Sequence, residues 1–121
     1  MFSSKVIVVL GLALTIVAAN VPGAPRVLTG DDLKDAENTL NSSLQKLASG
    51  DGPNYQLGKI ISATRQVVSG SLYKYEVELV DGNKATKKCN VSIWSQPWLD
   101  NGIEVSFECP GEDKVVKKHS A

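Results

Sequence analysis

The chain has 121 residues with 13 basic and 13 acidic side chains, so its formal net charge is zero. Its lysines are interspersed with acids or lie in expected loops and tail, without the clustered basic face that nucleic acids and anionic membranes favour. The length suits one compact domain with its own core. We therefore expect a monomer that binds neither nucleic acid nor membrane.

The N-terminal residues 1–19 are typical of a secretory signal peptide. Lys5 precedes an apolar run of about 14 residues, which closes on small residues and is too short for a comfortable membrane span. Val17-Ala18-Ala19 fits the cleavage pattern, so we expect a mature, extracellular domain over residues 20–121. Because the signal holds one lysine and no acid, the mature domain has a formal charge of −1.

Two cysteines, Cys89 and Cys109, lie in the expected mature part of the chain. In a secreted protein, two cysteines most simply form one disulfide. The alternative is a free nucleophilic thiol, which would need a neighbouring base, and the single histidine, His119, lies in the polar C-terminal tail. The sequence also holds no cluster of metal ligands and no phosphate-binding motif. We therefore expect no enzyme, no metal and no cofactor.

An arm containing proline and glycine, residues 20–28, precedes a predicted helix. Its prolines resist helix formation, so the arm is expected to be extended and can add an edge strand. Thr29 is a candidate N-cap, with Asp32 three places on as a variant capping box. An apolar stripe at spacings of three and four follows over about 18 residues, before a Gly/Pro-rich stop at residues 50–53. The stripe comprises Leu33, Ala36, Leu40, Leu44 and Leu47.

The rest of the chain predicts four strands, over residues 55–65, 71–80, 89–93 and 103–109. The last three alternate apolar and polar residues, which is typical of half-buried strands. The first is imperfect, because Ile60 and Ile61 are adjacent and Gly58 indicates either a bulge or a close approach of the helix. The fold class is therefore α+β, with one long helix packed on a four- to five-stranded antiparallel sheet.

The two cysteines predict the register of the last two strands. If Cys89 bonds Cys109 across an antiparallel pair, Val91 lies opposite Phe107 and Ile93 lies opposite Val105. The apolar residues then share one face, whereas a slip of one residue would break the match. The centre of the connecting loop falls at Leu99.

Two expected hairpin connections carry apolar side chains at their tips. The first is Gln66-Val67-Val68-Ser69-Gly70, in which Gly70 suits a turn but two valines are unusual. The second, residues 96–101, holds Pro97 and Trp98, and tryptophan is enriched in binding hot spots. Both groups can serve the fold instead, because the valines can cap the core and Trp98 can fold back over the sheet edge.

The meander topology predicts that both tips lie at one end of the sheet. We also expect the helix to run antiparallel to the first strand, since the connection between them is short. That arrangement brings the arm around Gly23 to the same end. The three segments would then form a wedge suited to a partner's cleft. Trp94 has the parity of a surface position and receives no role.

These features resemble the cystatins, which are secreted inhibitors of papain-like cysteine proteases. The likeness covers essentially the whole mature chain and includes Gly23, the long helix, the Gln-x-Val-x-Gly loop, the Pro97-Trp98 pair and the cysteine spacing. Within the family, residues 93–98 and the C-terminal ending look closest to the fly cystatins called sarcocystatins.

The resemblance implies a reversible, competitive inhibitor of papain and of cathepsins of the L and B types. The arm would lie in the non-primed side of the protease cleft, the valines over the catalytic cysteine, and the Pro-Trp pair in the primed side. The implied protease-binding residues are Gly23, Gln66, Val67, Val68, Ser69, Gly70, Pro97 and Trp98.

The chain departs from the family's pattern in two respects. It lacks the second disulfide of vertebrate-type secreted cystatins. Ser49-Gly50-Asp51 stands where legumain inhibitors carry Ser-Asn-Asp, so legumain inhibition is not expected. Asn41 and Asn90 begin sequons that permit glycosylation.

The alternative function is a non-inhibitory binding or host-defence module with the same fold, although the retention of all three wedge motifs argues against it.

Overall fold

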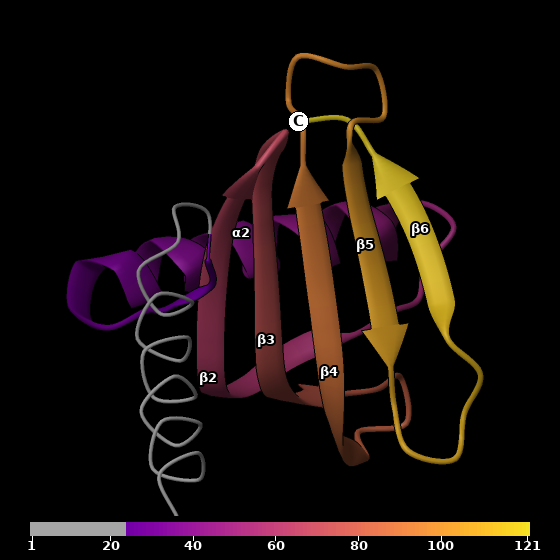
Figure 1. Cartoon of the computed structure of the whole chain (residues 1–121). Coiled ribbons are helices and arrows are strands. Elements are labelled where there is room, and N and C mark those ends of the chain that lie inside the picture. The colour runs from indigo at the N-terminus through magenta and orange to yellow at the C-terminus, as the bar shows by residue number, and fades with distance from the viewer. Residues whose placement is uncertain (1–23) are drawn as a thin grey trace, which may run out of the picture.

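One helix and six strands make up the computed structural model, which describes residues 24–121. The expected signal peptide and Gly23 lie outside these residues. The strands form a single antiparallel sheet in chain order (Figure 1). The elements are β1 (Arg26–Val27), α2 (Gly30–Ser49), β2 (Gln56–Val68), β3 (Gly70–Val80), β4 (Thr86–Ser95), β5 (Ile103–Glu108) and β6 (Val115–His119). The predicted α+β class is confirmed, with six strands instead of four or five.

The two additional strands come from the arm and from the C-terminal tail. Arg26 pairs with Arg65 in β2, so the arm does add a short edge strand. The tail, predicted to be a polar surface segment, instead pairs with β5 from Ile103–His119 to Phe107–Val115. It was missed because an edge strand needs only backbone pairing on one side, and residues 115–119 show no alternation of apolar and polar side chains. No helix within residues 24–121 has the length and apolar character needed to span a membrane.

The helix begins after Thr29, whose extended backbone confirms the predicted N-cap position, although its side chain makes no capping hydrogen bond. It ends at Ser49, and the C-cap residue Gly50 donates its backbone N–H to the carbonyl of Leu47. Figure 1 shows α2 crossing the back of the sheet, and it contacts both β2 and β6. The expectation that it runs antiparallel to the first strand is therefore wrong. A helix that crosses the strands covers more of a wide sheet than one that follows a single strand.

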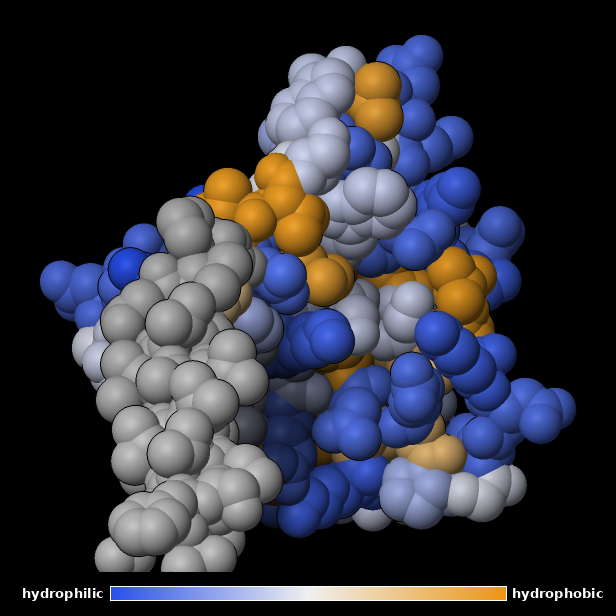
Figure 2. Space-filling model, in the orientation of Figure 1, coloured by the Kyte–Doolittle hydropathy of each residue, from blue (hydrophilic) through white to orange (hydrophobic). Residues whose placement is uncertain are grey.

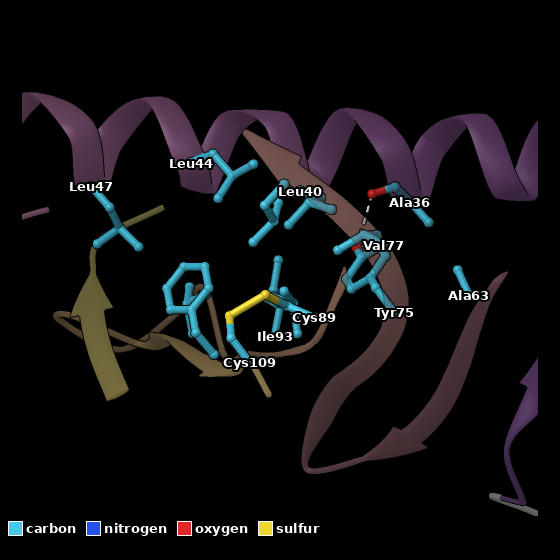
Figure 3. Packing of buried hydrophobic residues seen from close by; sticks show 14 of the residues in the cluster. Ala36, Leu40, Leu44, Leu47, Ala63, Tyr75, Val77, Cys89, Ile93 and Cys109 are labelled. Carbon is cyan, nitrogen blue, oxygen red and sulfur yellow. Dashed lines mark hydrogen bonds between the residues drawn. A yellow bond between two sulfur atoms is a disulfide. The ribbon is translucent and has the colours of Figure 1, made fainter. Parts of the chain in front are cut away.

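The core lies between α2 and the inner face of the sheet (Figure 3). The predicted stripe is buried at Ala36, Leu40, Leu44 and Leu47, while Leu33 is partly buried against the same cluster. The facing strands contribute buried side chains from alternate positions, which are Ala63, Tyr75, Val77, Leu79, Val91, Ile93, Ile103, Val105 and Phe107. Exclusion of these side chains from water is the main stabilising contribution to the fold.

Cys89 and Cys109 form a disulfide within this core, as predicted. The predicted register is also confirmed, because Val91 pairs with Phe107 and Ile93 with Val105. Both cysteines of the chain are therefore in the disulfide, and neither is a free thiol.

The imperfect alternation of β2 has a structural cause. The pairing with β3 shifts between Leu57 and Lys59 and again between Ile60 and Ser62. Gly58 and Ile61 are therefore bulge positions, which explains two adjacent isoleucines in one strand. A Cβ at Gly58 would lie 3.0 Å from the carbonyl oxygen of Glu78, so the close neighbour is β3 and not the helix.

Candidate functional site

The first hairpin tip is tighter than the sequence predicts. Pairing of β2 with β3 continues through Val67–Ser71 to Val68–Gly70, which leaves Ser69 as the single residue between the strands. The predicted five-residue connection is therefore wrong, since most of the pentapeptide belongs to strands. Because side chains alternate along a strand, Val67 and Val68 lie on opposite faces of this hairpin. The exposed fractions are 65% for Val67 and 41% for Val68.

Gly70 sits where this hairpin meets the end of β4. Its φ of +91° is a conformation that glycine adopts without strain. A Cβ at this position would also lie 2.2 Å from the carbonyl oxygen of Ser95, which is shorter than any tolerated contact. Only glycine therefore fits here, and its absence of a side chain lets the first tip lie directly against β4.

The second tip is a closed loop between β4 and β5. The Gln96 N–H donates to the Gly102 carbonyl at 2.8 Å, and the Leu99 N–H donates to the Gln96 carbonyl at 3.0 Å. Pro97 and Trp98 lie at the exposed end of this loop, with Trp98 63% exposed. The structure therefore excludes the alternative in which Trp98 folds back over the sheet edge.

Trp94, for which the sequence predicts no role, joins the two tips. Its indole Nε1–H donates to the Ser69 carbonyl oxygen at 2.9 Å. Gln96 Nε2 donates to the Ser69 hydroxyl oxygen at 3.2 Å. Sequence parity placed Trp94 correctly on the outer face, but its partner is a backbone atom of another hairpin, and no sequence signal marks that contact.

The arm is directed toward the same end of the molecule. Antiparallel pairing of β1 with the C-terminal half of β2, at Arg26–Arg65 and Val27–Thr64, leads the preceding residues Ala24 and Pro25 toward Val67. The expected convergence of arm and tips thus arises from β1 pairing and not from the helix direction. Gly23 itself lies outside the described residues.

The C-terminus braces the second tip from the other side. The Asn101 N–H donates to the Ser120 hydroxyl oxygen at 3.2 Å, and Lys46 Nζ from the helix donates to the Ser120 carbonyl at 3.1 Å. His119 is not in a free tail, because its Nε2 lies 2.9 Å from the Ser43 hydroxyl oxygen. Sequence reasoning missed this brace together with β6.

Exposed apolar side chains gather at this end of the sheet. Figure 2 shows hydrophobic surface over the β2–β3 hairpin and one hydrophobic patch on the otherwise pale loop above β4 and β5, with a further patch on the right-hand side, whereas the middle of the sheet face is mainly hydrophilic. Lys88 pairs with Glu76 at 2.9 Å on that face. The residues at the two tips are therefore suited to apolar contact with a partner and carry no arrangement of charged groups for acid–base chemistry.

Comparison with known proteins places this arrangement in a family. Residues 27–104, more than half of the chain, match the family model described as "Cystatin domain". The chain belongs to the cystatin family. The match spans both hairpin tips and the helix, and it confirms the resemblance seen in the sequence.

Individual relatives agree with the family model. This cystatin is 64% identical over 99 residues to Sarcocystatin-A of Sarcophaga peregrina, covering 82% of this chain and 81% of that protein. It is 42% identical over 116 residues to the Cystatin-like protein of Drosophila melanogaster, covering 90% and 91%. It is 29% identical over 80 residues to Cysteine proteinase inhibitor 3 of Oryza sativa subsp. japonica, covering 66% and 43%. No solved structure matches. The chain is a cystatin and not an enzyme.

Proposed function

We propose that this cystatin is a reversible, competitive inhibitor of papain-like cysteine proteases, including papain and cathepsins of the L and B types. The single observation that carries the proposal is the pair of adjoining hairpin tips with exposed apolar residues, Val67 on one and Trp98 on the other. The rice relative named as a cysteine proteinase inhibitor supports the same class of target.

The proposed mechanism is occlusion of the active-site cleft without chemistry. Val67 and Val68 cover the catalytic cysteine, and Pro97 and Trp98 fill the primed side of the cleft. The residues preceding β1, with Gly23, occupy the non-primed side. The peptide bonds beside Ser69 are held within a tight turn and are not offered as an extended segment to the protease nucleophile. Gln66 and Gly70 complete the first tip.

The geometry favours tight binding from an interface of modest size. The tips are tied to each other by the hydrogen bonds of Trp94 and Gln96 to Ser69, so little conformational freedom is lost on binding. Exposed apolar groups concentrated in one surface patch are the kind of feature that marks an interaction site.

The proposal includes secretion of a monomeric domain. Residues 1–19 act as a signal peptide that is cleaved after Ala19, leaving residues 20–121 as the inhibitor. The Cys89–Cys109 disulfide supports an oxidising, extracellular location, because disulfides persist in that compartment.

The test is a titration of papain and of a cathepsin L-type enzyme with the protein secreted by insect cells that express residues 1–121. A second form, in which the signal is fused directly to Ala24, lacks the arm through Gly23. Stoichiometric reversible inhibition that is weaker for the shortened form is the expected result. Absence of inhibition by the folded, disulfide-bonded protein would refute the proposal and favour a non-inhibitory binding module. The mass of the secreted protein reports the cleavage site.

A further inference from the structure

The indole of Trp94 is linked to the first hairpin by a hydrogen bond to the carbonyl oxygen of Ser69. Ser69 lies between β2 and β3, outside the ladder of paired residues that ends at Val68–Gly70. Within residues 24–121, its carbonyl accepts from the Trp94 Nε1–H at 2.9 Å and not from a strand N–H. A turn residue without ladder pairing is free to fray unless another group holds it. Trp94 supplies that group.

The ring of Trp94 lies on the outer face of the sheet, beside apolar side chains. Its cross-strand partner on β3 is Leu72, and both residues line a shallow hollow of about 160 Å³ together with Val68. The ring is 38% exposed. The indole therefore lies beside two apolar side chains while its N–H reaches the turn, which suits the amphipathic character of tryptophan.

Trp94 also lies at the base of the second tip. It is followed by Ser95, whose carbonyl abuts Gly70, and by Gln96, which donates to the Ser69 hydroxyl oxygen and begins the loop that holds Pro97 and Trp98. Movement of the first tip away from β4 would break all three contacts. The two tips are thus connected through one short segment, residues 94–96, where β4 ends and the loop begins.

We propose that Trp94 is a positioning residue that fixes the Gln66–Gly70 hairpin against the Pro97–Trp98 loop before a protease is met. This inference rests on the proposed inhibitory function. It differs from a direct contact role, because the contribution of Trp94 is made in the free inhibitor. Loss of the indole N–H lowers the fraction of molecules whose tips are in the binding arrangement.

A residue that acts in the free inhibitor affects the association rate, whereas a residue that contacts the protease affects the dissociation rate. When the binding-competent fraction falls, the apparent association rate falls in proportion, while the dissociation rate of the assembled complex stays the same. Truncation of a residue that contacts the protease instead accelerates dissociation. Trp94→Phe keeps an aromatic ring on Leu72 and Val68 but removes the N–H donor, so it separates these roles.

The first measurement compares the two indole N–H groups of the wild-type protein, and a variant is needed only to assign their signals. In the secreted protein labelled with ¹⁵N-tryptophan, two indole N–H signals are expected, and Trp94→Phe identifies the Trp94 signal by removing it. The Trp94 indole proton is expected to exchange with solvent more slowly than that of Trp98, which has no hydrogen-bond partner within residues 24–121. Equal exchange rates for the two indole protons would overturn the proposal.

The second measurement compares wild type, Trp94→Phe and Ser92→Ala. Ser92 lines the same hollow and leaves the Trp94 contact intact, so it is the matched control. Trp94→Phe is expected to accelerate amide exchange in the ladder pairs next to the turn, Gln66–Leu72 and Val67–Ser71. It is also expected to slow association with papain by up to about fivefold, the factor for one neutral hydrogen bond, with unchanged dissociation. Ser92→Ala is expected to match wild type in both readouts.

The outcomes distinguish this inference from the proposed function. If wild type does not inhibit papain, the proposed function fails, but amide exchange still shows whether Trp94 holds the first tip. If amide exchange in the pairs Gln66–Leu72 and Val67–Ser71 is unchanged in Trp94→Phe, the positioning role is wrong whether or not papain is inhibited. Faster dissociation with unchanged association would also overturn it, in favour of direct contact.

Discussion

The phenolic hydroxyl of Tyr75, in the middle of β3, donates a hydrogen bond of 2.8 Å to the backbone carbonyl of Ala36 in α2 (Figure 3). Both residues are buried, and this is a polar link across the core between helix and sheet. Burial, with a smaller contribution from Tyr73, raises the pKa of Tyr75 above its usual range. The phenol that links α2 to the sheet is therefore in its neutral form.

Tyr75→Phe is expected to lower the free energy of unfolding by about 1 kcal/mol at pH 7, the usual net contribution of one neutral hydrogen bond. The cost stays small because the ring is retained and the Ala36 carbonyl keeps its helical partner. Urea unfolding of both proteins, followed by far-ultraviolet circular dichroism, measures the difference. A loss of more than about 3 kcal/mol would show that the hydroxyl does more than bind one carbonyl.

The same residue predicts how stability changes in alkali. The pKa of Tyr75 is raised in the folded protein, whereas a phenol in the unfolded chain titrates near its ordinary value of about 10. The contribution of neutral Tyr75 is therefore complete below about pH 10 and is lost as the pH rises, by up to about 1.4 kcal/mol per pH unit. The stability difference between wild type and Tyr75→Phe should shrink and then reverse between pH 9 and 11. A difference that stays constant over this range would contradict a buried, neutral phenol.

Gly70→Ala should destabilise the protein more than Gly111→Ala does. Both glycines have positive φ, +91° and +74°, so each substitution carries about 1–2 kcal/mol of backbone strain. A Cβ at Gly111 meets nothing within 4 Å, whereas one at Gly70 lies 2.2 Å from the Ser95 carbonyl oxygen. The difference between the two variants in thermal unfolding isolates the contact between the tips. Equal losses of stability in the two variants would show that the first hairpin can move away from β4 without a loss of free energy of unfolding.

The elements that sequence predicted best are those with a repeating pattern or a covalent constraint. The helix stripe from Ala36 to Leu47 follows directly from the spacing of its apolar residues. The β4–β5 register follows from Cys89 and Cys109, since no other alignment puts both the disulfide and the apolar residues on one face. The position of both tips at one end of the sheet then follows from the meander.

The elements that sequence missed depend on backbone pairing or on contacts between distant segments. β6 pairs with β5 through backbone groups and buries little, so residues 115–119 carry no hydrophobic pattern. The direction of α2 depends on the width of the sheet, which includes β6. The Trp94–Ser69 bond depends on the β3–β4 register and on a turn of one residue, and neither was fixed by the sequence pattern.

The disulfide is expected to contribute to stability far more than to inhibition. Replacing both Cys89 and Cys109 by alanine should lower the free energy of unfolding by roughly 3 kcal/mol, because the unfolded chain loses a loop constraint. The bond joins the start of β4 to the residue after β5, at the end of the sheet opposite to the tips. Papain affinity well below the melting temperature should therefore change by no more than about twofold. Unchanged melting would show that the crosslink is dispensable, and a large loss of affinity would show that the second tip depends on it.

Trp98→Ala tests the contact role proposed for the second tip. The side chain is 63% exposed in the free inhibitor, so its removal should leave the melting temperature nearly unchanged. Binding to papain should weaken by about 1–3 kcal/mol, mainly through faster dissociation, as expected for a tryptophan at the centre of an interface. Stopped-flow association and displacement experiments separate the two rate constants.

The matched control for Trp98→Ala is Ile61→Ala. Ile61 is an apolar residue that is 42% exposed, and it lies in the bulge of β2, away from both tips. It is expected to leave both rate constants at the wild-type values. If Trp98→Ala dissociates from papain no faster than wild type and Ile61→Ala, Trp98 does not contact the protease. Inhibition that persists in that case would assign the interface to the β2–β3 hairpin and the arm.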